Sequence, residues 1–253
     1  MTKSKISVKE FWDEESKSYR VAQWEQSNVA KYDFHYTKNV LLNLLSPKPT
    51  DKILEIGCGA GKWVGVIAPK CKGLVAIDLS QRMIQQAKKY SKNFSNVNFL
   101  CNDFMKQTFD DKFDKVFAVR VVEYIHNKIK MFKKVHSLLE KNGKLVFITK
   151  NKPCLWDSSK KAKGFWQEKI SPFNFAKLLR KSGFNDIEIK PVVLRLPIFK
   201  SGNRELPLVS KKYEKLFLDF FSGLTDFSLN SENMISNLFL LTSESYALSC
   251  SKS

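Results

Sequence analysis

Three glycines and two carboxylates stand where a short loop could hold a nucleotide-sized ligand. The loop runs from Glu55 through Gly57, Gly59 and Gly61, and it follows an apolar run typical of a buried parallel strand. Glycines let the backbone turn tightly and approach a ligand closely. Asp78 ends the next apolar run, where a carboxylate could accept hydrogen bonds from a ribose diol. The spacing therefore predicts a site for a ligand that contains a nucleoside.

The spacing of this loop differs from the two common phosphate-binding patterns. The third glycine comes one residue earlier than in Gly-x-Gly-x-x-Gly, and no Ser or Thr follows Gly61-Lys62 as a P-loop requires. Glu55 would repel a pyrophosphate, whereas it suits a ligand with a cationic amino-acid end. A plain tight turn is the alternative for the loop, and for Asp78 it is a helix N-terminal acid beside a Ser80 cap.

With the stretches 99–104 and 113–125, these motifs make residues 50–150 resemble the class I S-adenosylmethionine-dependent methyltransferases. The resemblance implies S-adenosylmethionine as cofactor and S-adenosylhomocysteine as product. It implies the following cofactor-binding residues: Tyr19, Glu55, Gly57, Cys58, Gly59, Gly61, Asp78, Leu79, Met83, Asn102, Asp103, Phe104, Val119 and Arg120.

The resemblance also implies a part of the cofactor for several of these residues. Asp103 would face the exocyclic amine of the adenine and Phe104 the ring, while Val119 and Arg120 would lie along the methionine part. Tyr19 would either reach the cofactor carboxylate or only pack. The alternatives are a solvated turn for Asp103, a core position for Phe104 or Met83, and a small packing residue for Cys58.

Three candidates for a general base follow the fourth predicted strand: Glu123, Tyr124 and His126. Methyl transfer from a sulfonium is an in-line displacement, so a base is needed only if the acceptor must lose a proton. Many relatives have His where this chain has Tyr124, so a histidine role does not carry over to that position. Glu123 could instead only orient the loop, and His126 could cap the helix that follows.

The elements that must position these residues alternate between strands and helices, which predicts an α/β fold with a parallel sheet. The resemblance implies a Rossmann-like, seven-stranded, mostly parallel sheet with helices on both faces and an antiparallel last strand between the fifth and sixth. Strands are expected near 52–57, 73–78, 97–102, 113–119, 143–149, 185–196 and 244–251. Helices are expected near 7–25, 28–45, 60–70, 80–92, 128–141 and 171–183. A capping box of Ser7 and Glu10 would begin the first of these helices, and Asn142-Gly143 would end the fifth.

The whole chain, 1–253, is interpreted as one methyltransferase domain. Residues 1–46 would form an N-terminal helical lid and 50–150 the cofactor-binding core. Residues 150–170 and 198–241 would be acceptor-side insertions, the second of them a helical cap. A packed extra layer without acceptor contact is the alternative for that second insertion.

The composition limits the partners. The net charge of +18 favours an anionic partner, either nucleic acid or an acidic membrane surface. No apolar run is long enough for a transmembrane helix, no signal-peptide core is present, and the five scattered cysteines fit a reducing cytoplasm. The three histidines have no metal-ligand spacing, so no metal site is predicted. The oligomeric state is not indicated.

Three hypotheses for the function remain. The first is methyl transfer to a small-molecule, lipid-precursor or glycan acceptor, at oxygen; the apolar segment 198–241 and the loop with Trp156 and Trp166 favour it. The second is an RNA methyltransferase, favoured by the charge and by lysines beside those tryptophans. The third is a cofactor-binding partner subunit without transfer activity.

Overall fold

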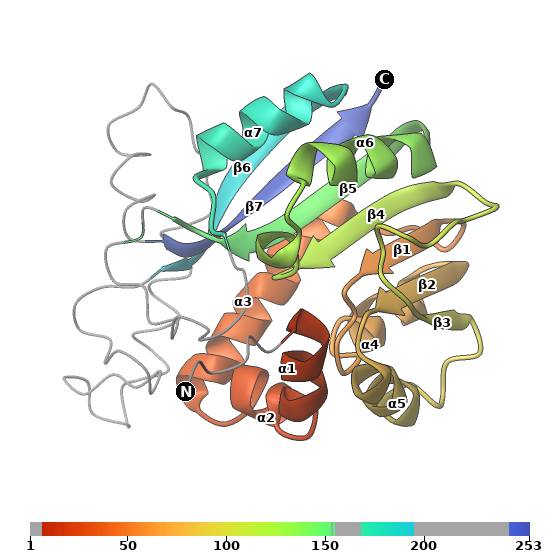
Figure 1. Cartoon of the computed structure of the whole chain (residues 1–253), viewed down its shortest axis with the longest axis vertical. Coiled ribbons are helices and arrows are strands. Elements are labelled where there is room, and N and C mark those ends of the chain that lie inside the picture. The colour runs from red at the N-terminus through yellow and green to blue at the C-terminus, as the bar shows by residue number, and fades with distance from the viewer. Residues whose placement is uncertain (1–6, 153, 155–167, 195–242) are drawn as a thin grey trace.

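A computed structural model describes residues 7–152, 154, 168–194 and 243–253 of the chain (Figure 1). Most of the predicted insertion 150–170, with both of its tryptophans, and all of 198–241 lie outside these residues. The helices are α1 (Val8–Glu15), α2 (Tyr19–Trp24), α3 (Asn28–Leu45), α4 (Val64–Ile67), α5 (Gln81–Tyr90), α6 (Lys128–Leu138) and α7 (Pro172–Lys181), with short 3-10 turns η1 (Ala68–Lys70) and η2 (Val122–Tyr124). The strands are β1 (Lys52–Ile56), β2 (Gly73–Asp78), β3 (Val97–Cys101), β4 (Phe113–Val119), β5 (Leu139–Lys150), β6 (Phe184–Leu194) and β7 (Ser243–Lys252).

The strands form one seven-stranded sheet in the order β3-β2-β1-β4-β5-β7-β6. The first five strands pair in parallel, and β7 pairs antiparallel with both β5 and β6. The fold class and the place of the last strand are therefore confirmed. Pro191 interrupts the register of β6, which the sheet tolerates because β6 lies at its edge.

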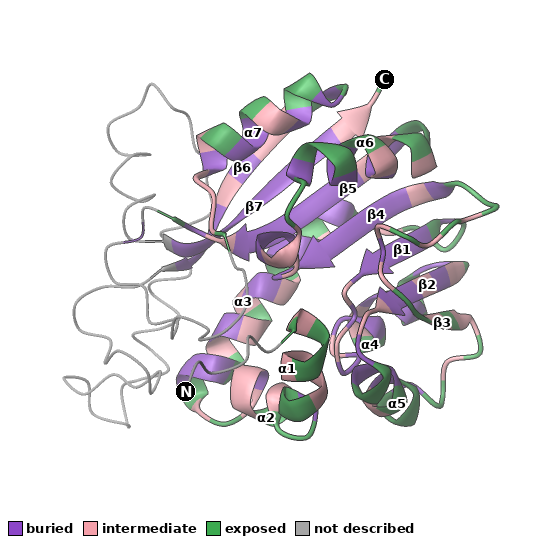
Figure 2. Cartoon of the chain, viewed as in Figure 1, coloured by how far each residue is buried: buried purple, intermediate pink, exposed green. Residues whose placement is uncertain are grey.

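Helices cover both faces of the sheet (Figure 1). The apolar sides of α6 and α7, including Phe132 and Phe175, pack against one face. The apolar sides of α3, α4 and α5, including Leu41 and Ile84, pack against the other. Figure 2 shows the strands buried between these layers and the outer sides of the helices exposed. The core thus fixes the C-terminal ends of the strands, where ligands bind in sheets of this kind.

The first helix and the helix before β5 differ most from the sequence prediction. The expected helix 7–25 is two helices, α1 and α2, separated by a turn at 16–18, although its predicted Ser7–Glu10 capping box is present. The expected helix 128–141 ends at Leu138, because Leu139 is already extended and pairs with Phe113. The left-handed Asn142 therefore lies in the irregular start of β5 and does not end the helix.

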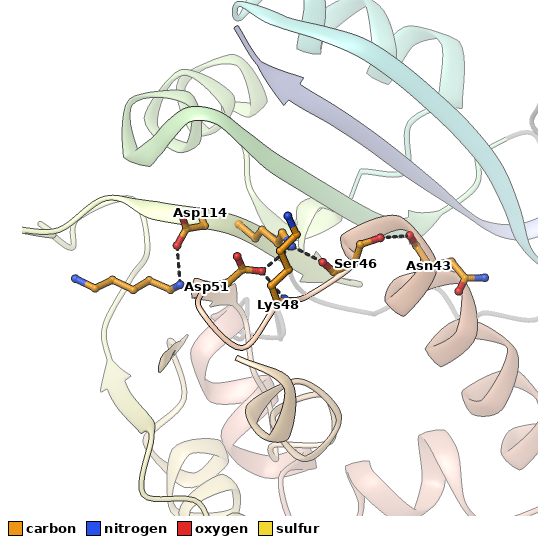
Figure 3. A network of polar contacts seen from close by, with 7 residues as sticks. Asn43, Ser46, Lys48, Asp51 and Asp114 are labelled. Atoms are coloured by element: carbon orange, nitrogen blue, oxygen red, sulfur yellow. Dashed lines mark hydrogen bonds and ion pairs between the residues drawn. The ribbon is translucent and has the colours of Figure 1, made fainter. Parts of the chain in front are cut away.

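A polar network joins the end of α3 to the starts of β1 and β4 (Figure 3). Lys115 Nζ lies 2.6 Å from Asp51 Oδ2 and also donates to the Ser46 carbonyl, which ends α3 in a left-handed conformation. Asp114 accepts from the Lys52 amide at 2.8 Å. Lys115 and Asp51 are both buried, so each charge depends on the other. This network lies at the opposite end of the strands from the predicted site.

Candidate functional site

A cavity of about 490 Å³ opens at the C-terminal ends of β1, β2 and β4. Most of the predicted cofactor-binding residues line it: Tyr19, Gly57, Cys58, Gly59, Asp78, Leu79, Met83, Asn102, Asp103, Phe104, Val119 and Arg120. Two of the three candidate bases, Tyr124 and His126, also line it. Glu55, Gly61 and Glu123 lie outside its wall. Most of the predicted site residues thus come together at one cavity, and the roles of all of them stay predictions.

The glycine loop is shaped by left-handed backbone conformations. The φ angles are +72° at Gly57, +51° at Gly59 and +79° at Gly61. Residues with a Cβ atom rarely adopt such values, whereas glycine adopts them readily. A Cβ atom on Gly57 would also lie 2.2 Å from Val121 Cγ2, and one on Gly61 would lie 2.9 Å from the Cα of Ala87. Gly61 is thus required for close packing against α5, while Gly57 and Gly59 present backbone to the cavity.

Asp78 fixes this loop from the tip of β2. Its Oδ2 accepts from the Gly59 amide at 2.8 Å, and its Oδ1 accepts from the Ser80 amide at 2.9 Å. Burial raises the pKa of Asp78, although these amide hydrogen bonds oppose the rise. A carboxylate has about four acceptor positions, so it can hold the loop and still accept from a ribose hydroxyl.

Glu55 lies beneath the loop, with 1% of its surface exposed. Burial and the nearby charge of Asp78 raise the pKa of Glu55 well above its usual range. Its Oε2 has no hydrogen-bond partner among the residues that the structure describes. The side chain therefore does not touch the cavity directly, and any effect on a cationic ligand would act from below the loop.

The residues predicted to contact the adenine of the cofactor, Asp103 and Phe104, follow β3. Asp103 Oδ1 accepts from the Met105 amide at 2.8 Å, so this carboxylate also makes the turn that the alternative interpretation proposed. Phe104 is buried, and Lys134 Nζ lies 5.0 Å from the centroid of its ring. The two side chains still border the cavity, and their contacts with adenine stay a prediction.

Helices α1 and α2 cover one side of the cavity mouth. Trp12 meets Tyr19 and Tyr124 edge to face, with ring centroids 5.2 and 5.5 Å away. Asp13 Oδ1 accepts from Ser80 Oγ at 2.5 Å, which ties α1 to the N-terminal end of α5. These ring contacts and this hydrogen bond hold the N-terminal helices in place beside the glycine loop. Their role as a lid stays a prediction.

Arg120 follows β4 in a conformation that non-glycine residues rarely adopt, with φ of 59°. Its amide donates to the Ile148 carbonyl at 2.7 Å. The side chain is 6% exposed, and Nη1 lies 3.7 Å from Glu244 Oε1. The Nε donor has no partner among the described residues. Strained backbone of this kind persists where the surroundings enforce it, and such residues cluster at functional sites.

The candidate bases are placed very differently from one another. Glu123 is buried and accepts from Thr149 Oγ1 at 2.7 Å, so the alternative that it orients the loop fits its contacts. Burial raises the pKa of Tyr124, so this phenol stays protonated at neutral pH. His126 is exposed at the rim, and the helix cap it could have provided is made by Asn127, whose Oδ1 accepts from the Lys130 amide at 2.9 Å.

Sequence reasoning missed a buried ion pair behind Arg120. Lys150 Nζ lies 2.9 Å from Glu244 Oε1, and the Glu244 side chain is 0% exposed. Burial lowers the pKa of Lys150, the charge of Arg120 lowers it further, and Glu244 opposes both effects. The pair joins β5 to β7 across 94 residues of sequence. A local motif could not have indicated it.

No helix in the described part of the chain combines the length and apolarity needed to cross a membrane. The described residues also contain no group of three or more histidine, cysteine or acidic side chains that could hold a metal ion.

Comparisons with known proteins agree with this geometry. A family model described as a methyltransferase domain matches residues 29–189. The chain is 28% identical over 125 residues to malonyl-[acyl-carrier protein] O-methyltransferase 1 of Ilyobacter polytropus, covering 48% of this chain and 46% of that protein. It is 31% identical over 106 residues to nodulation protein S of Sinorhizobium fredii, covering 41% and 49%. The matches thus span about half the length of these curated relatives.

The fold has close structural counterparts as well. The N-methyltransferase NodS of Bradyrhizobium japonicum, solved with S-adenosyl-L-homocysteine, superposes with a TM-score of 0.63 at 16% identity. The superposition covers 96% of this chain and 97% of that one. At this identity the likeness concerns the fold.

Proposed function

This chain belongs to the class I S-adenosylmethionine-dependent methyltransferases, and we propose that it transfers a methyl group to an oxygen of a small-molecule, lipid-precursor or glycan acceptor. One observation carries the proposal. The glycine loop and Asp78 share a cavity of about 490 Å³ with the aromatic side chains Trp12 and Tyr124. A cofactor site that continues into an aromatic mouth suits a compact acceptor group shielded from water.

The residues of the cavity would divide the work as follows. S-adenosylmethionine, when bound, supplies a methyl group on a positively charged sulfur, which is already activated for displacement. Asp78 and the loop amides would hold the nucleoside. Trp12 and Tyr19 would exclude water from the mouth, because their rings pack edge to face across it. Positioning of acceptor and methyl carbon at about 3–3.5 Å is then the main catalytic contribution of the protein.

The named relatives support a low-molecular-weight or carrier-linked acceptor. One is an O-methyltransferase acting on malonyl-[acyl-carrier protein], and another is named for ubiquinone biosynthesis and is also an O-methyltransferase. The structural counterpart NodS is an N-methyltransferase. Oxygen is proposed because the curated relatives of these two kinds are named O-methyltransferases.

Transfer of labelled methyl from S-adenosylmethionine into a cell extract tests this proposal. The extract would be separated into RNA, protein, lipid and small-molecule fractions after incubation. Label in the lipid or small-molecule fraction is expected, and the Asp78→Ala variant should abolish most of it. The variant Asp111→Ala, at an exposed acid far from the cavity, is the matched control and should behave as wild type.

RNA is the second candidate acceptor, because the net charge is +18 and helix α6 contains no acidic residue. Lys130 and Lys133 on α6 are exposed, and Lys130 borders the cavity. Label confined to the RNA fraction would favour this candidate over the first. Binding to RNA should then weaken steeply as salt is raised from 50 to 200 mM, as phosphate contacts require.

A further inference from the structure

The order of strands separates the two halves of the cavity. Asp78 ends β2, the glycine loop follows β1 and Asp103 follows β3, so the nucleoside part of the cofactor would lie across these three neighbouring strands. Its methionine part would point toward the end of β4. The next strands along the sheet are β4, β5 and β7. Arg120 follows β4, Lys150 ends β5 and Glu244 lies near the start of β7. Arg120 therefore lies at the methionine end of the site, where an acceptor would approach the methyl group, and Lys150 and Glu244 lie behind it, outside the cavity wall.

Arg120 has an unused donor on that side. Its Nε is buried without an acceptor in the described part of the chain, and Arg120 is among the residues that line the cavity. Its Cζ lies 5.4 Å from the ring centroid of Trp24, within the range of a cation–π contact. A buried donor without a partner is costly, and a guanidinium is built to bind a carboxylate through two parallel hydrogen bonds.

The charges around Arg120 also favour an anion. Glu244 Oε1 is closer to Lys150 Nζ, at 2.9 Å, than to Arg120 Nη1, at 3.7 Å. Lys169 is close enough that the charge of Lys150 lowers its pKa, in addition to the effect of burial. The charges of Glu244 and Glu123 both oppose the lowering of the pKa of Lys150 and of Lys169, so two carboxylates face the three cations. A negatively charged acceptor group would relieve their mutual repulsion.

The wall of the cavity offers little to remove a proton from an acceptor. Glu123 lies outside the wall, bound to Thr149, and Tyr124 has a raised pKa. Asp78 and Asp103 stand at the nucleoside end. Among the carboxylate and imidazole groups of the described wall, His126 at the rim is the remaining candidate. An acceptor that is already ionised at neutral pH would need no base at all.

We propose that the accepting group is a carboxylate and that Arg120 holds it beside the cofactor. The inference rests on the proposed function and names its acceptor chemistry. A carboxylate oxygen forms a bond to the methyl carbon while the sulfur–methyl bond breaks, and the bonding pair goes to sulfur. The products are a methyl ester and a neutral thioether. No proton is released, and the two opposite charges of the reactants cancel.

The chemical stability of the product tests the carboxylate. Labelled methyl would be transferred from S-adenosylmethionine into the cell extract, and the products would then be treated with mild alkali. A methyl ester releases its label as volatile methanol under these conditions, whereas methyl ethers and methylamines retain it. Most of the enzyme-dependent label is expected in the volatile form. Label that stays non-volatile would overturn the carboxylate and leave methyl transfer intact, whereas no label in any fraction would overturn both.

Variants of Arg120 test the second half of the proposal. Arg120→Gln should lower the rate of volatile-label formation about tenfold to a hundredfold, the range for a charged hydrogen bond. Arg120→Lys should recover part of that loss because it restores the charge. Binding of S-adenosylhomocysteine, measured by calorimetry, should stay within about threefold of wild type in both variants. Lys177→Gln, at an exposed cation on α7, is the matched control for loss of one charge.

Two results would overturn the role of Arg120. Loss of S-adenosylhomocysteine binding in Arg120→Lys would place the guanidinium on the cofactor carboxylate. A reaction rate that falls as pH drops from 8 to 6, and that is abolished in His126→Asn, would show that a base removes a proton from the acceptor. The carboxylate proposal expects a flat profile over this range, because model carboxyl groups ionise near pH 4.

Discussion

Asp78 combines two tasks in a single side chain. Its carboxylate holds the Gly59 amide and so shapes the glycine loop, and the same oxygens face the cavity where a ribose would lie. The sequence indicated the second task through the spacing of strand ends. The first became visible only with the geometry, because an acid at the tip of one strand bonds to the loop that follows another.

Replacing Asp78 with Ala should weaken S-adenosylmethionine binding by about 1.5–3 kcal/mol, the range for hydrogen bonds to a charged group. Asp78→Asn should lose less, because an amide oxygen can still accept from the Gly59 amide. Calorimetric titration of both variants, with thermal unfolding as a check on the loop, measures the difference. Unchanged affinity in folded Asp78→Ala would count against the ribose assignment.

Glu55 should make the stability of the ligand-free protein depend on pH. Its pKa is raised in the folded state, so the folded protein holds a proton that the unfolded chain has released above pH 4.5. The free energy of unfolding therefore falls as pH rises from 4.5 through the folded pKa. Glu55→Gln lacks this term, so it should be more stable than wild type at pH 8, with the advantage shrinking toward pH 4.5.

Urea unfolding of the two proteins at several pH values checks this expectation. The exposed Glu14→Gln variant is the control for removal of one carboxylate. A constant difference between wild type and Glu55→Gln across pH 5 to 8 would mean that Glu55 is not held by burial in the protonated form.

The break between helices α1 and α2 depends on contacts that the local sequence does not indicate. Residues 7–25 have helical composition throughout, yet the chain turns at 16–18 between α1 and α2. The turn lets Trp12 and Tyr19 face each other at 5.2 Å across the mouth of the cavity. The capping box at Ser7, in contrast, involves only four consecutive residues, so the sequence indicates it directly, and its prediction is confirmed.

Asp13→Ala should loosen α1 from α5. It removes the 2.5 Å hydrogen bond from Ser80 and a negative charge at the start of α5, worth about 0.3–1 kcal/mol. Trypsin should therefore cut faster at Lys17, measured with and without S-adenosylhomocysteine. The neighbouring exposed Glu14→Ala variant is the control, and equal cleavage rates in the two variants would contradict the tie between these helices.

Strands were predicted more accurately than the ends of helices. The apolar runs 73–78 and 113–119 coincide with β2 and β4, because buried parallel strands consist of continuous apolar residues. The C-terminal end of α6 was misjudged, since Asn142-Gly143 resembles a helix stop and in fact belongs to the irregular start of β5. Pairing of Leu139 with Phe113 on another strand overrides the local signal.

The polar network around Lys115 and Asp51 lies at the end of the sheet away from the cavity, so a change there should affect stability and leave ligand binding unaffected. Lys115→Met leaves the buried Asp51 carboxylate without its ion pair, which should cost about 3–5 kcal/mol of unfolding free energy. The affinity for S-adenosylhomocysteine should stay unchanged, because the network and the cavity lie at opposite ends of the strands. Urea unfolding and calorimetric titration measure the two quantities.

A double variant sharpens this experiment. Asp51→Asn combined with Lys115→Met removes both charges and keeps an oxygen that can accept from the Lys48 amide. It should recover part of the lost stability, since an unpaired buried charge costs more than a missing pair. A double variant as unstable as Lys115→Met would mean that the loss comes from packing.

The contacts that could not be predicted from the sequence join residues that are far apart along the chain. The glycine loop and Asp78 are about twenty residues apart and were predicted together. Lys150 and Glu244 are separated by 94 residues, and nothing near either residue indicates the other. The unused donor of Arg120 likewise depends on which side chains the fold places around it. The cofactor half of the site was therefore predictable, and the half beyond it was not.

The place of β7 in the sheet has a consequence for synthesis on the ribosome. Strands β1 to β4 end at Val119, so the half of the sheet that carries the glycine loop can begin to assemble early. Lys150 must wait 94 further residues for Glu244, roughly 5–20 s at about 5–20 residues per second. During that interval β5 has an open edge where β7 will insert. Pairing of this open edge with another chain would therefore compete with the insertion of β7 at that stage of translation.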